Sequence, residues 1–353
     1  MSRSKALAVQ ASGLMTAVGF NSAATCAAIR GGVGGTHESN LWDSGTGKYL
    51  FACRVKVPHW WEQDDMLPEL VAPAIHQCRV AAQPHPPEHI PLLLGVAAPG
   101  RPGRSSYLDH KLLSDVQRKL GAQFHPTSRV IAEGRVSTIV ALKEAVTLIE
   151  QHRVPCCIIA GVDSFLRRRV VEQYLEDRRI KSEDNSNGFI PGEAGTAILV
   201  APAKDGDELE ILGLSMANEP ATIDSGQPLH GVGLTKACRG ALDVAGVAMI
   251  DMQYRLSDLN GEHYGFKDAG FMQVRLDKAP AGRTAPAGWN MDIWHPSEYV
   301  GDIGAAFGPL LLGLALEANR KGYAPSPMTL CHLSNDNGRR GAVVLGYQGR
   351  RGR

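Results

Sequence analysis

The chain has 353 residues, of which 44% are apolar, and its 37 lysines and arginines nearly balance its 36 aspartates and glutamates. This length predicts two domains, or one large domain with two halves, with ample volume for a buried core. The net charge of +1 excludes binding to duplex nucleic acid or to an anionic membrane surface, since both need clustered excess lysine and arginine. Arg350, Arg351 and Arg353 form a short basic tail that is expected to be a solvated terminus.

No apolar run approaches the roughly 20 residues that span a bilayer, and the first ten residues lack the apolar core of a signal peptide. A cytoplasmic protein is therefore expected. The seven cysteines are an odd number without CxxC spacing, so neither a disulfide framework nor a zinc site is predicted, and no cofactor is expected. Cys156 and Cys157 lie in an apolar run that is typical of a core strand.

Apolar runs with the composition of strands alternate with helical patterns along the first half of the chain. The predicted strands cover residues 7–15, 90–98 and 154–162, and the predicted helices cover residues 22–32, 107–120 and 137–152. This alternation is typical of an α/β protein with helices packed on a largely parallel sheet. In 137–152 the apolar residues are too dense for a surface helix, so this helix is expected to be buried in the middle of the fold.

A second half with the same plan is predicted to begin near Asp205, after a strand at 195–203. It contains a strand at 208–216, a helix at 234–245, a strand near 252–256 and a small-residue segment at 301–320. The similar plan of the two halves suggests an internal duplication. The predicted domains are therefore an N-terminal half, residues 1–203, and a C-terminal half, residues 204–353.

The segment that starts at Gly188, GFIPGEAGTAILV, resembles the turn and strand that close the first half of β-ketoacyl synthases, members of the thiolase-fold family. Four further segments fall in that family's order: GLMTAVGFNSAATCAAIRGG, IIAGVDSF, GDIGAAFGPLLLGLA and LSNDNGRRGAVVLGY. The resemblance covers nearly the whole chain. It implies a thiolase-like α/β fold, in which duplicated βαβαβ halves give a five-layered α-β-α-β-α arrangement.

The resemblance also implies where a site would lie. In that family two buried helices meet back to back, and the dipoles and backbone N–H groups at their N-termini stabilise a thiolate and an oxyanion. A cysteine at the start of the first buried helix carries the acyl group, and two histidines from the second half polarise the thioester. The resemblance further implies a homodimer that pairs edge strands near residues 154–160.

This sequence departs from the family pattern at each of these positions. Arg135 stands at the position of the nucleophilic cysteine, and Asp258 and Asp302 stand at the positions of the two histidines. Ser297 stands at the position of a family lysine. Because all four positions differ from the family pattern, no catalytic residue is assigned. We hypothesise that Arg135 forms a buried ion-pair cluster with Asp258 and Asp302, because a guanidinium pairs well with carboxylates and buried charges persist only when paired.

Other interpretations of these residues stay open. The three charged residues could be solvated separately in an open pocket, Asp258 and Asp302 could act as an acid/base pair, or the register at Arg135 could be wrong. His263 and His295 are each expected to be loop histidines outside the pocket, although an insertion could bring His263 into it. The last loop of the family, a GFGG run, reads DNGR here at 336–339.

Three classes of function fit these observations. The first, a pseudoenzyme that acts as a binding or adaptor protein, is favoured, because degenerate relatives of this kind occur in bacterial type VI secretion gene clusters; an effector or secretion-system protein would be the partner. The second is a subunit that handles acyl-CoA or acyl-carrier-protein thioesters, alone or paired with an active ketosynthase. The third is an acyltransferase with Ser137 or Thr138 as nucleophile, which would need a nearby general base.

Two further segments are candidate contact surfaces. The helix predicted at 167–179 is amphipathic and rich in charge, so it is either a solvated helix or a surface for a partner. Trp60 and Trp61 are expected to serve in packing or in an exposed aromatic contact.

Overall fold

The computed structural model describes residues 6–57, 64–204, 206 and 208–349. Trp60, Trp61 and the basic tail at 350–353, for which the sequence analysis made predictions, lie outside the described residues. Among the described residues, no helix is long and apolar enough to cross a membrane. Ten strands form one hydrogen-bonded sheet, which consists of two five-stranded halves.

The first half of the sheet has the strand order β1-β7-β6-β4-β5. These strands are β1 (Leu7–Met15), β4 (Leu92–Gly95), β5 (Arg129–Ile131), β6 (Cys157–Ser164) and β7 (Glu193–Pro202). β7 runs antiparallel to both β1 and β6, whereas β4 runs parallel to both β6 and β5. β6, which contains Cys157, is buried along its whole length, as the sequence predicted for a core strand.

The second half repeats this pattern in the order β8-β12-β11-β9-β10. Its strands are β8 (Leu209–Asn218), β9 (Tyr254–Ser257), β10 (Asp292–Trp294), β11 (Met328–Ser334) and β12 (Arg339–Tyr347). β12 is antiparallel to both neighbours and β9 is parallel to both neighbours, so the two halves are duplicates in topology. Within the ten-stranded sheet the halves are hydrogen-bonded where β1 meets β8, at the pairs Ala8–Glu210 and Val9–Leu209. A boundary at residue 203 stays a prediction.

The expectation of a largely parallel sheet holds within each half for all strands except one, because β7 and β12 each return antiparallel to the strand before them. Ser164, the last residue of β6, pairs with Glu193, the first residue of β7. In the second half a short turn brings Arg340 opposite Ser334. The chain thus returns to the sheet at the same end of the strands at which it left, and an antiparallel return of this kind needs no crossover helix.

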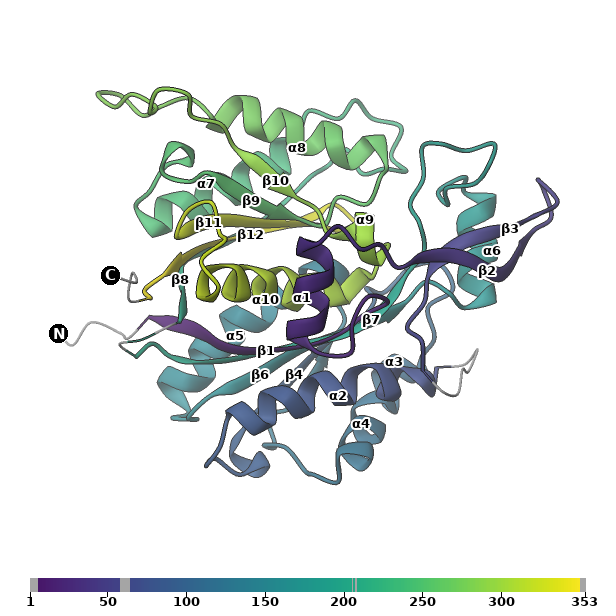
Figure 1. Cartoon of the computed structure of the whole chain (residues 1–353), viewed down its shortest axis with the longest axis horizontal. Coiled ribbons are helices and arrows are strands. Elements are labelled where there is room, and N and C mark those ends of the chain that lie inside the picture. The colour runs from purple at the N-terminus through teal and green to yellow at the C-terminus, as the bar shows by residue number, and fades with distance from the viewer. Residues whose placement is uncertain (1–5, 58–63, 205, 207, 350–353) are drawn as a thin grey trace.

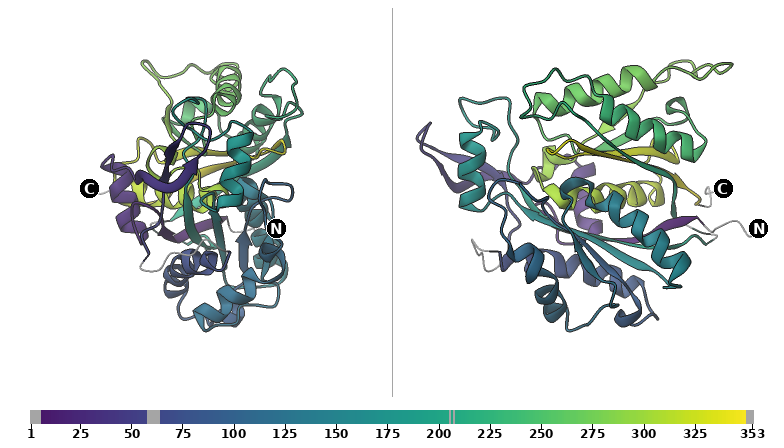
Figure 2. Two further views of the ribbon diagram at one scale, coloured as in Figure 1. Left: turned by 90° about the vertical axis from the view of Figure 1, so that its right-hand side faces the viewer. Right: turned by 180° about the vertical axis from the view of Figure 1, so that it is seen from behind.

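Helices cover both outer faces of the sheet and fill the space between its halves (Figures 1 and 2). The central pair is α5 (Ser137–Gln151) and α10 (Phe307–Arg320); the outer helices are α2 (Met66–Ala81) and α4 (Leu112–Leu120) on the first half, and α7 (Val232–Ala245) and α8 (His263–Leu276) on the second. α5 contacts β6 and β12, and α10 contacts β1 and β11, so each central helix touches both halves. This arrangement confirms the five layers.

The predicted burial of residues 137–152 is confirmed for the start of the helix and for its core-facing side, whereas Lys143, Thr147 and Glu150 are exposed. Ile139 and Leu142 of α5 are fully buried in the core between the two sheet halves, together with Phe307 and Leu311 of α10. The helix predicted at 107–120 is broken into two pieces, α3 (Tyr107–His110) and α4, which are separated by Lys111.

A smaller unit projects from one end of the layers (Figures 1 and 2). It combines the hairpin of β2 (Thr36–Asp43) and β3 (Lys48–Cys53) with α6 (Arg168–Glu176). Leu50 of β3 and Tyr174 of α6 pack with Phe165 and Phe189 in a separate apolar cluster. α6, which lies within the charged segment predicted at 167–179, therefore has one face in this cluster and one in solvent.

The predicted dimer contact near residues 154–160 is wrong. β6 covers residues 157–164 and lies between β4 and β7, which occupy both of its hydrogen-bonding edges. A buried central strand has no free edge with which to pair across a two-fold axis. The edges of the ten-stranded sheet are β5 and β10 instead.

A close backbone approach holds the start of α10 against β6. A Cβ atom on Gly161 of β6 would overlap the carbonyl oxygen of Ala305, which belongs to the 3-10 turn η4 (Gly304–Ala306) that leads into α10. This position therefore requires glycine for its lack of a side chain.

The variant Gly161→Ala should lower the free energy of unfolding by about 1–3 kcal/mol, because the added methyl group forces α10 away from the sheet. Urea unfolding at equilibrium measures the change. Gly270→Ala in α8 is the matched control, since its Cβ atom would meet no atom within 4 Å, and it should leave the stability unchanged or raise it slightly. Equal midpoints for both variants would contradict the close approach.

Candidate functional site

The side chain of Arg135 lies where the two central helices begin. Arg135 is the middle residue of the 3-10 turn η2 (Gly134–Val136), which leads into α5 as η4 leads into α10. Both turns start at a glycine with a positive φ, 55° at Gly134 and 51° at Gly304. Residues with a Cβ atom rarely adopt this backbone conformation, so glycine at these two positions allows the chain to turn into each helix.

The guanidinium of Arg135 is buried among carboxylates, with 9% of the side chain exposed. Its Nη2 donates to Oδ2 of Asp302, and its Nε lies 3.9 Å from Oδ2 of Asp258. Its Nη1 lies 3.4 Å from Oδ1 of Asp336 and donates to the carbonyl of Ser334 at 3.3 Å. Burial opposes the charge of Arg135, but the carboxylates outweigh it and raise the pKa of Arg135 above its usual value.

Asp302 connects the two helix starts. Its side chain is fully buried; Oδ1 accepts the backbone N–H of Gly304 at 3.0 Å, and Oδ2 accepts from Nδ2 of Asn260 at 2.8 Å. Because Oδ2 also accepts from Arg135, one carboxylate binds the turn before α10 and pairs with the turn before α5. Both carboxylate oxygens of Asp302 therefore accept at least one hydrogen bond.

Asp258 follows β9 and forms a looser contact with Arg135 than Asp302 does. Its Oδ2 accepts the backbone N–H of Ser334 at 2.8 Å. Burial raises the pKa of Asp258 to about 6, although the positive charge of Arg135 and this hydrogen bond act in the opposite direction. The structure therefore brings Arg135, Asp258 and Asp302 together, and they are not separately solvated.

A second arginine extends this cluster. Nε and Nη2 of Arg179 donate to the two carboxylate oxygens of Glu262 at 2.7 and 2.8 Å, and its Nη1 donates to Asp336 at 2.9 Å. Asp336 thus lies between two guanidinium groups, which lower its pKa below the usual range against the effect of burial. Nδ2 of Asn260 joins Glu262, at 3.0 Å, to Asp302. These residues form one cluster, which we call the Arg135 network: Arg135, Arg179, Asp258, Asn260, Glu262, Asp302 and Asp336.

A cavity of about 340 Å³ opens beside the Arg135 network. Its lining includes Arg135, Arg179 and Asp336 from the network and residues 97–102 from the loop after β4. Arg101 of this loop has 8% of its side chain exposed; its Nη1 lies 2.9 Å from Asp163, and its guanidinium lies over the ring of Phe165. No cysteine or histidine is among the described residues that line the cavity.

The other predicted site residues lie outside this cavity. Ser297, in α9 (Ser297–Val300), is buried and donates to the carbonyl of Leu259, so it supports the backbone beside Asp258 without entering the network. His263 is exposed at the start of α8, and His295 lies beside Glu298 and Phe266. Both histidines are therefore outside the pocket, as expected.

Ser137 and Thr138 are enclosed in the protein core. Oγ of Ser137 donates to the carbonyl of Ile131 at 3.0 Å and accepts the backbone N–H of Glu133 at 3.2 Å. The side chain of Thr138 packs where a Cβ atom on Gly308 of α10 would lie. Neither hydroxyl lines the cavity beside Arg135, so neither is placed as a nucleophile.

All seven cysteines are buried and unpaired with one another. Burial raises the pKa of each thiol, for example to about 11 at Cys53 and at Cys156 and to about 12 at Cys26. A thiol with such a pKa is protonated at neutral pH and is a poor nucleophile. Within the described ranges, no group of three or more histidine, cysteine or acidic side chains could hold a metal ion.

Sequence reasoning missed Arg179, Glu262 and Arg101. Arg179 belongs to the segment predicted at 167–179 as a helix that is either solvated or a surface for a partner, but it follows α6 and turns into the interior, where 9% of its side chain is exposed. Its partner Glu262 is 83 residues away in the chain. For Arg101 the available signal was the PGRPG run at 99–103, because two glycines and two prolines around one arginine indicate a loop that holds that arginine in place.

Comparisons with solved structures show which fold this is. The chain is similar to the ishigamide ketosynthase/chain length factor, with 19% identity over 98% of this chain and 100% of that chain and a TM-score of 0.69. It is similar to a ketosynthase in complex with its chain length factor from Xenorhabdus doucetiae, with 16% identity, coverages of 98% and 99% and a TM-score of 0.71.

A third similar structure is a type II polyketide synthase acyl-carrier protein in complex with its ketosynthase bound to the hexaketide. The match has 13% identity, covers 98% of this chain and 100% of that chain, and has a TM-score of 0.75. No family model and no curated protein matches the sequence. The chain therefore has the thiolase fold of ketosynthases, as the sequence resemblance implied.

The variant Arg135→Ala should lower the free energy of unfolding by about 3–5 kcal/mol, because it leaves Asp302 buried without its cationic partner. Chemical denaturation checks this value. Arg118→Ala is the control: Arg118 pairs with Asp115, but 77% of its side chain is exposed, and its removal should cost less than about 1 kcal/mol. If Arg135→Ala is no more destabilising than Arg118→Ala, the network does not stabilise the helix starts.

Glu193, at the start of β7 in the PGEA segment, gives a prediction for pH dependence. It is fully buried and accepts from Ser164 Oγ at 3.0 Å and from the backbone N–H of Val55 at 3.1 Å; burial raises its pKa to about 7. Between about pH 4.5 and 7 the unfolded chain has lost this proton while the folded chain keeps it, so stability should fall as pH rises, by up to about 3 kcal/mol. Unfolding at several pH values should show a shallower decline for Glu193→Gln; an unchanged decline would exclude Glu193 as its source.

Proposed function

We propose that this protein is a non-catalytic, ketosynthase-like protein that acts by binding. The observation that carries this proposal is the buried pair between Arg135 and Asp302 at the start of α5. In the related fold this is the place where a cysteine would hold an acyl group, as the resemblance implies. An arginine cannot form a thioester, and its charge is already satisfied by the Arg135 network.

Acid/base catalysis by Asp258 and Asp302 is the weaker alternative. Asp302 accepts hydrogen bonds from Arg135, Asn260 and the backbone of Gly304, so both of its carboxylate oxygens are already engaged inside the protein. Asp258, whose pKa is raised to about 6, is held by the backbone of Ser334. Neither carboxylate is paired with a nucleophile among the described residues.

An adaptor role fits this chemistry, with a protein as the ligand. The exposed face of α6 and the projecting hairpin of β2 and β3 are surfaces that a partner could contact. An effector or another component of a type VI secretion system stays the predicted partner, on the strength of the resemblance alone.

A second candidate is a subunit that pairs with an active ketosynthase. Its support is that two of the similar structures contain a chain length factor beside a ketosynthase and span this chain almost completely. In this role an acyl-carrier protein would be a further partner, and the free edge strand β5 would be available for pairing with another chain. A homodimer would use the same edge.

Incubation of the purified chain with acyl-CoA or with acylated acyl-carrier protein should leave its intact mass unchanged. Among the described residues that line the cavity beside Arg135 there is no thiol, and its two hydroxyl-bearing residues, Tyr174 and Thr222, have no histidine in the lining to act as a base. An active ketosynthase treated in parallel should gain the mass of the acyl group. A stable acyl adduct on this chain would contradict the proposal. Light scattering with and without a co-expressed ketosynthase then separates the two binding roles, since only the second candidate requires a heterodimer.

A further inference from the structure

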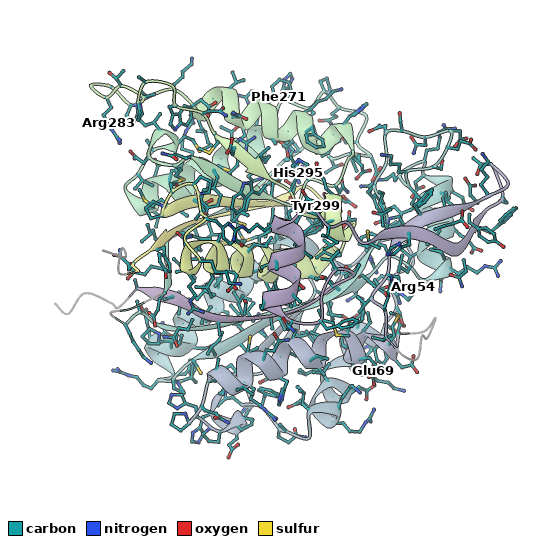
Figure 3. The ribbon with its side chains drawn as sticks, in the orientation of Figure 1. Arg54, Glu69, Phe271, Arg283, His295 and Tyr299 are labelled. Carbon is teal, nitrogen blue, oxygen red and sulfur yellow. The ribbon has the colours of Figure 1, made fainter. Side chains whose placement is uncertain are left out.

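A second cavity, of about 280 Å³, lies among α1 (Ser22–Arg30), β10, α9 and α10. It shares no lining residue with the cavity beside Arg135. Figure 3 labels two residues of its wall, His295 and Tyr299, next to α1. We call it the α1 cavity. The proposed binding role does not involve the α1 cavity, so we consider the ligand of this cavity separately.

Aromatic rings form much of the wall of the α1 cavity. Trp294, Tyr299 and Tyr323 all line it, and each is only half-buried. The rings of Trp294 and Tyr323 are stacked, with centroids 6.3 Å apart and planes inclined by 24°, and Tyr254 supports Trp294 from the core at 4.7 Å. The faces of Trp294 and Tyr323 are largely taken up by each other, by Tyr254 and by Arg30, so a guest meets these two rings mainly at their edges. Edge-to-face contacts of this kind favour an apolar aromatic guest.

The floor of the α1 cavity is apolar and uncharged. Ile29 of α1 and Leu314 of α10 line it together with Cys26. Burial raises the pKa of Cys26 to about 12, so the thiol is protonated at neutral pH and behaves as a small hydrophobic group. An apolar ring system would therefore lose little by leaving water for this floor.

The rim carries one cation that has no carboxylate partner. The guanidinium of Arg30 lies 4.3 Å from the centroid of the Tyr323 ring, and no ion pair of Arg30 is found within the part of the chain that the structure describes. The acid at the rim, Glu298, faces His295, whose Nε2 is 3.5 Å away. A positive charge held over an aromatic wall and left without an anion is a binding group for a guest's negative charge.

We propose that the α1 cavity binds a small, flat aromatic molecule that carries an anionic group such as a carboxylate. The ring system lies against Trp294 and Tyr323 above the apolar floor, and the anionic group pairs with Arg30. The cavity volume suits one or two fused rings. This site shares no residue with the Arg135 network, so an experiment that contradicts this proposal leaves the proposed binding role unaffected.

The test uses 2-naphthoate as the probe and the full chain as the protein, with isothermal titration calorimetry as the readout. Saturable binding with one site per chain is expected. The neutral analogue 2-naphthalenemethanol and the non-aromatic cyclohexanecarboxylate should each bind at least tenfold more weakly, because each lacks one of the two recognised features. Naphthoate should also quench tryptophan fluorescence, and Trp294→Phe should reduce this quenching while it keeps an aromatic wall.

Variants locate the site. Arg30→Ala should weaken naphthoate binding at least tenfold, and Arg30→Glu should reverse the preference in favour of 2-naphthylmethylammonium. Arg118→Ala is the control for loss of an exposed arginine and should bind naphthoate like the unmodified chain. Arg30 is exposed, so these variants should keep the circular dichroism spectrum and melting temperature of the parent. Absence of saturable binding at millimolar naphthoate, or equal affinity of Arg30→Ala and the parent, would overturn the proposal.

Discussion

The pair between Arg135 and Asp302 is the interaction on which the interior of this protein depends. It joins the turn before α5 to the turn before α10, and therefore joins the two duplicated halves at the point where both central helices begin. Removing two charges from water is costly, and the cost is offset only if the remaining hydrogen-bonding groups are also satisfied. Asn260, Asp336 and the backbone of Gly304 supply most of those partners, and Arg179 with Glu262 extends them. Nε of Arg135 is the exception: it is buried without a hydrogen bond and lies 3.9 Å from Asp258.

The same constraint explains why the cavity beside Arg135 offers binding groups, while its described lining contains no thiol and no imidazole. Each charge that lines it from the network is already paired, and the thiols of the chain are buried elsewhere with raised pKa values. The chain thus has a cavity at the place to which the resemblance assigns the reaction centre, and the groups that line it from the Arg135 network are charged. The α1 cavity differs in kind, because it combines aromatic walls with Arg30, a cation for which the described residues provide no ion pair.

Much of the fold could be predicted from the sequence, since it rests on local patterns. The strand predicted at 7–15 coincides with β1, and the buried helix predicted at 137–152 differs from α5 by one residue. The directions of β7 and β12 could not be predicted, because an apolar run has the same composition whichever way it enters a sheet. The assignment of residues 154–160 to an interface failed for the same reason: burial between two strands and burial between two subunits leave the same sequence pattern.

The sequence by itself determined that an arginine and two aspartates, and no thiol or imidazole, stand at three particular positions, and that these positions come together if the fold is the thiolase fold. Only the tertiary structure decided which charges pair. Arg179 and Glu262 are 83 residues apart, and their contact arises because the loop after α6 and the start of α8 meet at one end of the layers. An ion pair between distant segments leaves no periodic signal in the chain, since its energy depends on distance and burial, which exist only after folding.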